Sequence, residues 1–366
     1  MRLTPLTAAL ATLIAASLVA CAQSALEPQP AEAAADTSLG SRAISSTPQS
    51  WDYRIAQVIT ASDQQVVNQD VWNATPASVS SLHAAGKSVI CYFSAGTWEY
   101  NNATRGIVNR ALTDRNANGV IDGAGNATEA AAVSAAIQAG ASSYSVGGQT
   151  VLFSSDQKTF KNLAGSTLPG WDEYVYKIAG FTPGSATPEH TLLRALMIGH
   201  IDRALAIGCD ALEPDNIDAY ANVTGIGDTE QYAYNTWLAS TAHAKGLKIF
   251  LKNDLDQIPN GGVGVPAGSS SGLAYKFDGL INEECMKFKE CALSAPFRDL
   301  GKPIFVREYS IKATCSGYKS AKYSGGPSNR EAIANQYHLN VSVSQYGNGG
   351  SPDANANAPK CTFGTW

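Results

Sequence analysis

Short apolar runs recur along the chain, and several are preceded by a helix-like segment that ends in glycine. Residues 81–87 lead into the run at residues 88–94, and residues 241–247 lead into the run at residues 248–252. Further apolar runs follow Gly208 and Gly301. Near-continuous apolar runs are typical of parallel strands buried on both faces. The repeated helix–glycine–strand joins therefore predict consecutive β/α units.

Eight runs fit this scheme, and we expect them to form the strands of a (β/α)8 TIM barrel, an α/β fold. They are residues 65–71, 88–94, 174–178, 210–213, 248–252, 279–282, 304–307 and 338–343. A short extended stretch at residues 51–60 is not counted among them. Active sites in this fold lie at the C-terminal ends of the strands, so the residues that follow each run are the functional candidates.

Polar side chains gather at these predicted strand ends. The carboxylates, amides and hydroxyls are Ser94, Glu99, Glu213, Asp215, Asn216, Asp218, Asn253, Asp254, Asp256, Asn282, Glu283, Glu284 and Glu308, and Trp98, Tyr100, Tyr220 and Tyr309 lie close by. Any one of them could belong to a solvated acidic turn. Their recurrence favours a sugar site, because carboxylates supply acid, base and nucleophile while aromatic rings stack on sugar faces. Glu213 and Asp215 would point the same way on a regular strand.

Residues 100–170 fit no single β/α unit, and we expect an insertion after the second barrel strand. Within it, the stretch from Asp114 to Asp122 matches most of a calcium-binding loop. The twelfth position of such a loop, usually a bidentate glutamate, is Gly125, so Glu129 or another group would have to replace it. The same residues also fit an Asn/Gly turn. A structural Ca2+ therefore stays open, and catalysis by carboxylates needs no cofactor.

Composition narrows the functional class. The 366 residues are 44% apolar and 16% charged, which suits one large core of barrel size. A net charge of -5 without any basic run argues against nucleic acid as a partner. The five histidines and the cysteines show no zinc-ligand spacing, which disfavours a metallohydrolase. We expect a monomer.

The N-terminus, residues 1–21, has the pattern of a bacterial export signal. Arg2 precedes an apolar run at residues 6–20 that is too short to span a membrane. Residues 18–21, Leu-Val-Ala-Cys, resemble a lipobox, in which Cys21 would be lipidated and become the mature N-terminus. The alternative is an ordinary signal peptide that is cut near residues 22–24.

Residues 22–50 are rich in alanine, serine and proline and lack periodicity, so they predict a disordered tether. The glycosidase-sized domain is then residues 51–366. These features predict a lipoprotein at the cell envelope, or a secreted protein if the lipobox is not used. The lipid anchor would be its sole link to the membrane.

The six cysteines beyond the lipobox allow 15 pairings, and export to an oxidising compartment permits disulfides. We expect bonds where both partners lie in loop-like surroundings, namely Cys285 with Cys291 and Cys315 with Cys361. Cys91 and Cys209 lie in apolar strands, and we expect them to be buried thiols.

Four motifs at the strand ends resemble those of glycoside hydrolase family 114, the endo-α-1,4-polygalactosaminidases and their relatives. They are Val-Ile-Cys-Tyr-Phe-Ser-Ala-Gly at residues 89–96, Glu-Pro-Asp-Asn at 213–216, Leu-Lys-Asn-Asp-Leu-Asp-Gln at 251–257 and Asn-Glu-Glu-Cys at 282–285. The similarity runs from about residue 51 to residue 309, with the insertion between. It implies a (β/α)8 barrel that cleaves α-1,4-linked galactosamine polymers.

The resemblance also implies roles for single residues. Asp215 would be the nucleophile and Glu283 the acid/base, and the pocket would be lined by Tyr92, Lys252, Asn253 and Asp254. From their positions we expect further substrate contacts from Ser94, Glu99, Glu213, Asn216, Asp218, Tyr220, Glu284 and Glu308. The chain departs from the family pattern at two points. The loop after Glu99 is longer than usual, and Glu284 is a second acid beside Glu283, which leaves the acid/base assignment open between them.

The sequence thus predicts an endo-acting, retaining glycosidase for an amino-sugar polysaccharide, whose cationic chain an acidic rim would attract. The predicted fourth and sixth strands carry Asp215 and Glu283, and alternate strands contribute to one layer, so the two carboxyls should face each other. Glu213 is the rival nucleophile. The alternatives are a non-catalytic carbohydrate-binding cell-surface protein and a structural surface protein. The presence of both Asp215 and Glu283 favours the enzyme.

Replacing Cys21 with serine tests the lipid anchor. Serine lacks the thiol that receives the lipid, so C21S should move the protein from the membrane fraction to the soluble fraction of fractionated cells. Ser24→Ala, which leaves the lipobox intact, is the control and should stay with the membranes. Equal partitioning of C21S and the wild-type chain would contradict lipidation.

Overall fold

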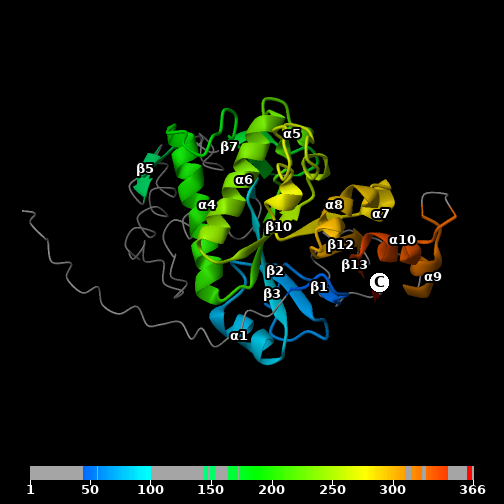
Figure 1. Cartoon of the computed structure of the whole chain (residues 1–366). Helices are drawn as coiled ribbons and strands as arrows, with labels where there is room; N and C mark the ends of the chain where they lie inside the picture. The colour runs from blue at the N-terminus through cyan, green and yellow to red at the C-terminus, as the bar shows by residue number, and fades with distance from the viewer. Residues whose placement is uncertain are drawn as a thin grey trace, which may run out of the picture. The chain divides into compact units, whose positions relative to one another are not determined.

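Parallel strands follow one another around a barrel in the computed structural model (Figure 1). In spatial order they are β1 (Trp51–Tyr53), β2 (Val66–Asp70), β3 (Ser88–Ser94), β9 (Ala211–Asp215), β10 (Lys248–Lys252), β11 (Gly279–Glu283), β12 (Ile304–Tyr309) and β13 (Leu339–Ser344). A ninth strand, β14 (Cys361–Phe363), pairs antiparallel to β13. The ring is nearly closed, because β13 lies beside β1 and Gln49 N donates to the side-chain Oδ1 of Asn340 at 2.6 Å. The predicted α/β barrel is confirmed.

The structure describes residues 44–55, 57–99, 143–146, 149–152, 164–171, 173–309, 315–323, 327–344 and 361–364. All belong to one compact unit, Ser41–Trp366. The expected export signal with Cys21, most of the expected tether and the candidate calcium loop from Asp114 to Asp122 lie outside these residues.

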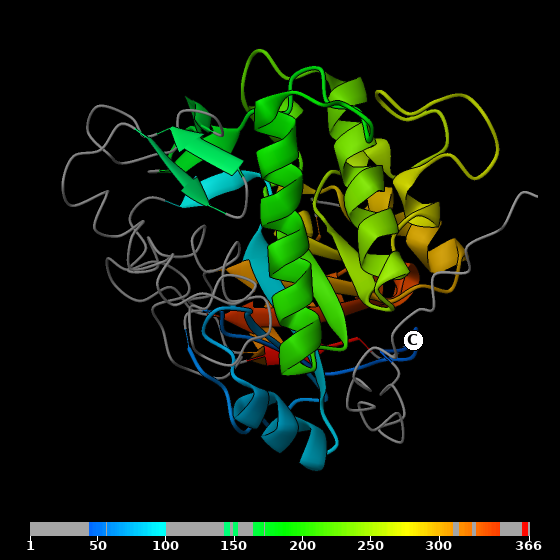
Figure 2. The ribbon, with the colours of Figure 1, turned by 90° about the vertical axis from the view of Figure 1, so that its left-hand side faces the viewer.

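Helices cover the outside of the barrel. They are α1 (Pro76–Ala84), α4 (Pro188–Ile207), α5 (Ala219–Asn222), α6 (Asp228–Ala244), α7 (Cys285–Phe288), α8 (Ala295–Asp299), α9 (Cys315–Ser320) and α10 (Arg330–Tyr337), with single 3-10 turns at Leu255–Gln257, Leu273–Tyr275 and Cys291–Ser294. Figure 2 shows α4 and α6 side by side in front of the strands. Local sequence sets their ends: Thr187 caps the start of α4, and Gly208 ends it with a φ of 90°.

Two apolar cores result, one between the strands and the helices and one inside the barrel. The inner core is formed by Ile44, Trp51, Tyr53, Val66, Ile90, Ala211, Phe250, Ile281 and Phe305. Each strand therefore buries both faces, as the near-continuous apolar runs predict. Ile44 belongs to the expected tether, yet it is buried in this core.

The strand count of eight is right, but one member is wrong. Residues 174–178, expected in the barrel, instead contribute to β8 (Glu173–Tyr176), which forms an antiparallel sheet with β4 (Thr97–Glu99) and β7 (Ala164–Thr167). The uncounted segment at residues 51–60 supplies β1 in its place. The insertion therefore follows the third barrel strand, and it also holds the hairpin of β5 (Ser143–Val146) and β6 (Gln149–Leu152).

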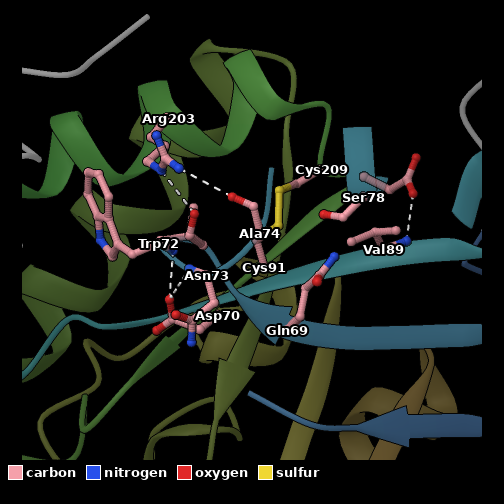
Figure 3. The surroundings of a disulfide bond; sticks show 12 residues. Gln69, Asp70, Trp72, Asn73, Ala74, Ser78, Val89, Cys91, Arg203 and Cys209 are labelled. Atoms are coloured by element: carbon pink, nitrogen blue, oxygen red, sulfur yellow. Dashed lines mark hydrogen bonds between the residues drawn. A yellow bond between two sulfur atoms is a disulfide. The ribbon is translucent and has the colours of Figure 1, made fainter. Parts of the chain in front are cut away.

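This misplacement explains a second correction. Cys91 and Cys209 are not buried thiols, because they form a disulfide across a sequence separation of 118 residues (Figure 3). With residues 174–178 removed from the barrel, β3 and β9 become neighbours, and the two cysteines come together. In the same region Arg203 of α4 donates to the carbonyls of Val71 and Ala74, which ties that helix to the turn after β2.

The other two disulfides are confirmed: Cys285 bonds Cys291, and Cys315 bonds Cys361. Three disulfides indicate a protein that matures in an oxidising compartment. Within the part of the chain that the structure describes, no helix is both long and apolar enough to span a bilayer.

The Cys91–Cys209 bond should be the disulfide that matters most for stability, because it closes a far longer loop than its neighbours. Cys91→Ala/Cys209→Ala should lower the free energy of unfolding by about 4 kcal/mol. Cys285→Ala/Cys291→Ala, which opens a separation of 6 residues, is the matched control and should cost less. Urea unfolding measures both. Equal losses, or two free thiols in the unfolded unreduced protein, would contradict the assignment.

Candidate active site

Four ionisable side chains from three adjacent strands meet inside the mouth of the barrel. Lys252 of β10 lies at the centre, with its Nζ 2.8 Å from Glu213 Oε1, 3.2 Å from Asp215 Oδ1 and 3.7 Å from Glu283 Oε1. Glu213 and Asp215 come from β9 and Glu283 from β11, at alternating inward positions of parallel strands. The strand ends predicted from the sequence therefore do converge on one point.

The four groups differ sharply in their access to solvent. The side chains of Glu213 and Lys252 are 0% and 1% exposed, whereas those of Asp215 and Glu283 are 18% and 30% exposed. Glu213 lies one strand repeat below Asp215, which places it under the site. Asp215 and Glu283 are thus the carboxyls of this group that a sugar can reach.

Three hydrogen-bond donors satisfy the buried carboxyl of Glu213. It accepts from Lys252 Nζ, from Tyr53 OH at 3.3 Å and from Asn68 Nδ2. Burial raises the pKa of Glu213 to about 7, against the opposing attraction of Lys252. Burial alone would lower the pKa of Lys252, but the charges of Asp215, Glu213 and Glu283 raise it well above its usual range. Lys252 is therefore a cation at any physiological pH.

The two accessible carboxyls are held in place from both sides. Asp215 accepts from Tyr92 OH at 3.1 Å and from the Asn216 backbone N–H at 2.9 Å. Tyr309 OH donates to Glu283 Oε1. Because both carboxyls approach the same Lys252 Nζ, their nearest oxygens are no more than about 7 Å apart, a limit that includes the roughly 5–5.5 Å of retaining glycosidases.

The backbone at the strand ends takes up a costly conformation. Asn216, Asn253, Asp254 and Glu284 all have φ between 46° and 60°. Left-handed non-glycine residues cost free energy and gather at functional sites. Gly96 completes the frame: its N–H and that of Ala95 both donate to the Asp215 carbonyl at 2.9 Å. A Cβ on Gly96 would lie 1.6 Å from the Asn216 carbonyl oxygen, so this approach requires glycine.

A second acidic group lies beside the first. Burial and the charge of Asp215 raise the pKa of Asp218 to about 6, and burial and Asp218 raise that of Asp254 well above its usual range. Asp254 accepts from Tyr220 OH at 3.0 Å and from Asn235 Nδ2 at 2.8 Å. It therefore positions Tyr220 at the rim.

Ser94, Asn216 and Asn253, which we expected to contact substrate, instead hold neighbouring parts of the strand ends in place. Ser94 Oγ and Thr97 Oγ1 both accept from Asn216 Nδ2, at 3.2 and 2.9 Å. Asn253 Oδ1 accepts from the Glu283 backbone N–H at 2.9 Å. These contacts fix the residues that follow Asp215 and Lys252.

The remaining expected contacts do not join this group. Glu284 pairs with Lys287 at 2.6 Å. Side chains alternate along β12, so Arg307 faces the lumen of the barrel and Glu308 faces outward. On the outer side Glu308 accepts hydrogen bonds from Met286 N at 2.9 Å and from Tyr318 OH at 2.8 Å. The backbone of Glu99 pairs with Glu173, and its side chain lies outside the described part.

The sequence did not single out several residues of the site. Tyr53 and Asn68 were missed because β1 was not counted as a strand, so their inward direction was not evident. Glu173 comes from the insertion: Thr97 Oγ1 donates to it at 2.6 Å, and burial, with a smaller effect of Asp215, raises its pKa. Arg307 stacks between Tyr53 and Tyr309, 5.3 and 5.6 Å from their ring centres. The inward alternation of residues 305, 307 and 309 is the signal that could have found it.

Across the described residues, no three His, Cys, Asp or Glu side chains are arranged to hold a metal ion. Glu213 pairs with Lys252, while Tyr92 and Tyr309 hold the carboxyls of Asp215 and Glu283. Two accessible carboxyls held in this way suit acid–base and nucleophilic catalysis at a glycosidic bond.

The chain matches one protein-family model, and it is similar in fold to solved structures. A family model described as glycoside-hydrolase family GH114 matches residues 30–119 and 119–332. The chain is similar in fold to Aspergillus fumigatus Ega3, solved in complex with galactosamine, with 21% identity, a TM-score of 0.54 and coverage of 86% of this chain and 96% of that one. The glycoside hydrolase domain of PelA from Pseudomonas aeruginosa matches with 13% identity, a TM-score of 0.48 and coverage of 86% and 100%. No curated protein matches the sequence.

The outward-facing Glu308 should make stability fall as the pH rises. Burial raises its pKa to about 7, so the folded state favours the proton, and this stabilisation is present below about pH 4.5 and lost as the pH passes 7. Between pH 5 and 8 the wild-type chain should lose roughly 2–3 kcal/mol more than Glu308→Gln, measured by urea unfolding. Glu331→Gln on α10 is the control and should follow the wild type. Parallel pH profiles for Glu308→Gln and the wild type would contradict the burial argument.

Proposed function

The chain belongs to glycoside-hydrolase family GH114, and we propose that it cleaves α-1,4-linked galactosamine-containing polysaccharide within the polymer and with retention of configuration. One observation carries this proposal: Asp215 and Glu283 are partly exposed and converge on the buried Lys252. That arrangement supplies two carboxyls at a spacing suited to a double displacement.

In the proposed mechanism Asp215 attacks the anomeric carbon while Glu283 gives its proton to the leaving oxygen. The carbon–oxygen bond of the glycoside breaks as the bond to Asp215 forms. Glu283 then takes a proton from water, which attacks the same carbon and releases Asp215. Tyr92 and Tyr309 hold the two carboxyls through the hydrogen bonds described above.

The acidic surroundings support a cationic substrate. Asp218 and Asp254 lie beside the catalytic pair, and their pKa values are raised first by burial and then by repulsion from neighbouring carboxyls. A protonated amino sugar would relieve that repulsion, and an acidic mouth attracts a polycation over distance. The galactosamine bound in the Ega3 structure supports the same substrate class. We propose that the enzyme acts outside the cell, anchored through Cys21 or secreted, as a monomer.

Substitution of the two carboxyls tests this function on galactosamine polymer. Asp215→Asn and Glu283→Gln should each lower kcat by roughly a thousand-fold or more without changing the melting temperature, with activity measured as new reducing ends. Glu284→Gln is the matched control and should stay within about ten-fold, because Glu284 pairs with Lys287.

Azide separates the two roles. With Asp215→Gly it should restore turnover and give a glycosyl azide of inverted configuration, whereas with Glu283→Ala the azide product should keep the substrate's configuration. Full activity in Asp215→Asn, or binding of the polymer without cleavage by the wild type, would contradict the proposal.

A further inference from the structure

Lys252 and Glu213 form a buried ion pair directly beneath the two catalytic carboxyls. We propose that this pair is a positioning device: Lys252 keeps the carboxylate of Asp215 aimed at the substrate, and Glu213 holds Lys252 in place without touching substrate. The inference rests on the proposed function, because it assigns Asp215 and Glu283 their roles. It removes Glu213 both as a rival nucleophile and as a substrate contact.

Glu213 cannot reach a bound sugar. Its side chain is 0% exposed, and three donors from β1, β2 and β10 already occupy its oxygens. It lies two residues before Asp215 on one strand, so it is about 7 Å deeper in the barrel. An anomeric carbon in contact with Asp215 would therefore be a full layer above it.

Lys252 is equally enclosed, and its position suits a shared counter-ion. Its side chain is 1% exposed, and its Nζ touches Tyr53 OH at 3.4 Å in addition to the three carboxyls. The rings of Tyr53 and Tyr92 lie 5.6 and 5.9 Å from the charge. The titratable and charged groups around it, taken over all facing elements, are Tyr53, Tyr92, Glu213, Asp215, Asp218, Glu283, Arg307 and Tyr309.

The shared cation fits both steps of the reaction. Before the first step its Nζ lies 3.2 Å from Asp215 Oδ1 and holds the attacking carboxylate in place. Once Asp215 is bonded to the sugar, that carboxylate has lost its charge, and Glu283, 3.7 Å from the same Nζ, becomes the accessible partner of Lys252. Glu283 has just given up its proton to the leaving oxygen and must next act as a base toward water. Lys252 keeps its own proton throughout.

Three variants test the device: Glu213→Gln, Lys252→Met and the double variant. The double variant leaves the buried layer neutral, so it should fold even if Lys252→Met alone does not. In the double variant kcat should fall by roughly a hundred-fold while KM stays within about three-fold, because a displacement of a reacting group by about 1 Å costs that much in rate. Glu213→Gln should lose roughly ten-fold in kcat and show no rescue by azide.

Wild-type kcat in the double variant would overturn the inference, as would an inactive Glu213→Gln that azide restores. A crystal structure of the double variant supplies a readout without turnover, because the carboxyl of Asp215 should leave the position that Lys252 gives it. If the wild type cleaves no galactosamine polymer, the proposed function fails, while the position of Asp215 in the double variant still decides the role of Lys252.

Discussion

A single buried ammonium group holds the site together. Lys252 Nζ lies within 4 Å of three carboxyls, which without it would place up to three negative charges in one small volume. Burying a charge is costly unless it is paired and hydrogen-bonded, and both Lys252 and Glu213 meet that condition. Neutralisation from below lets Asp215 and Glu283 stay close together while both face the open mouth.

The barrel makes this arrangement possible because it delivers side chains in layers. The lower layer is apolar, with Trp51, Phe250 and Phe305 among its members, and it excludes water from beneath the ion pair. Above it the strands end in left-handed residues, which turn the chain away at once and leave the carboxyls at the rim. The Cys91–Cys209 bond ties β3 to the start of β9, the strand that carries Asp215.

The sequence predicted the barrel and the convergence of Asp215 and Glu283 at the strand ends, because these follow from local pattern and motif. It predicted less where the answer depends on neighbours in space. Residues 174–178 are as apolar as a barrel strand, and their pairing with β4 decides where they belong. Glu308 and Arg307 are adjacent in sequence, and the phase of the closed barrel decides which one faces the lumen. Glu213 and Asp215 share a face, so only their depth in the barrel distinguishes the fully buried Glu213 from the partly exposed Asp215.

We propose that Asp215 and Glu283 together perform a double displacement on an amino-sugar polymer. The most direct measurement is proton NMR of the anomeric signals while the wild-type enzyme cleaves galactosamine polymer, recorded before mutarotation equilibrates the new reducing ends. The α-anomer should appear first, since two displacements restore the starting configuration. First appearance of the β-anomer would show a single displacement by water and would contradict Asp215 as the nucleophile.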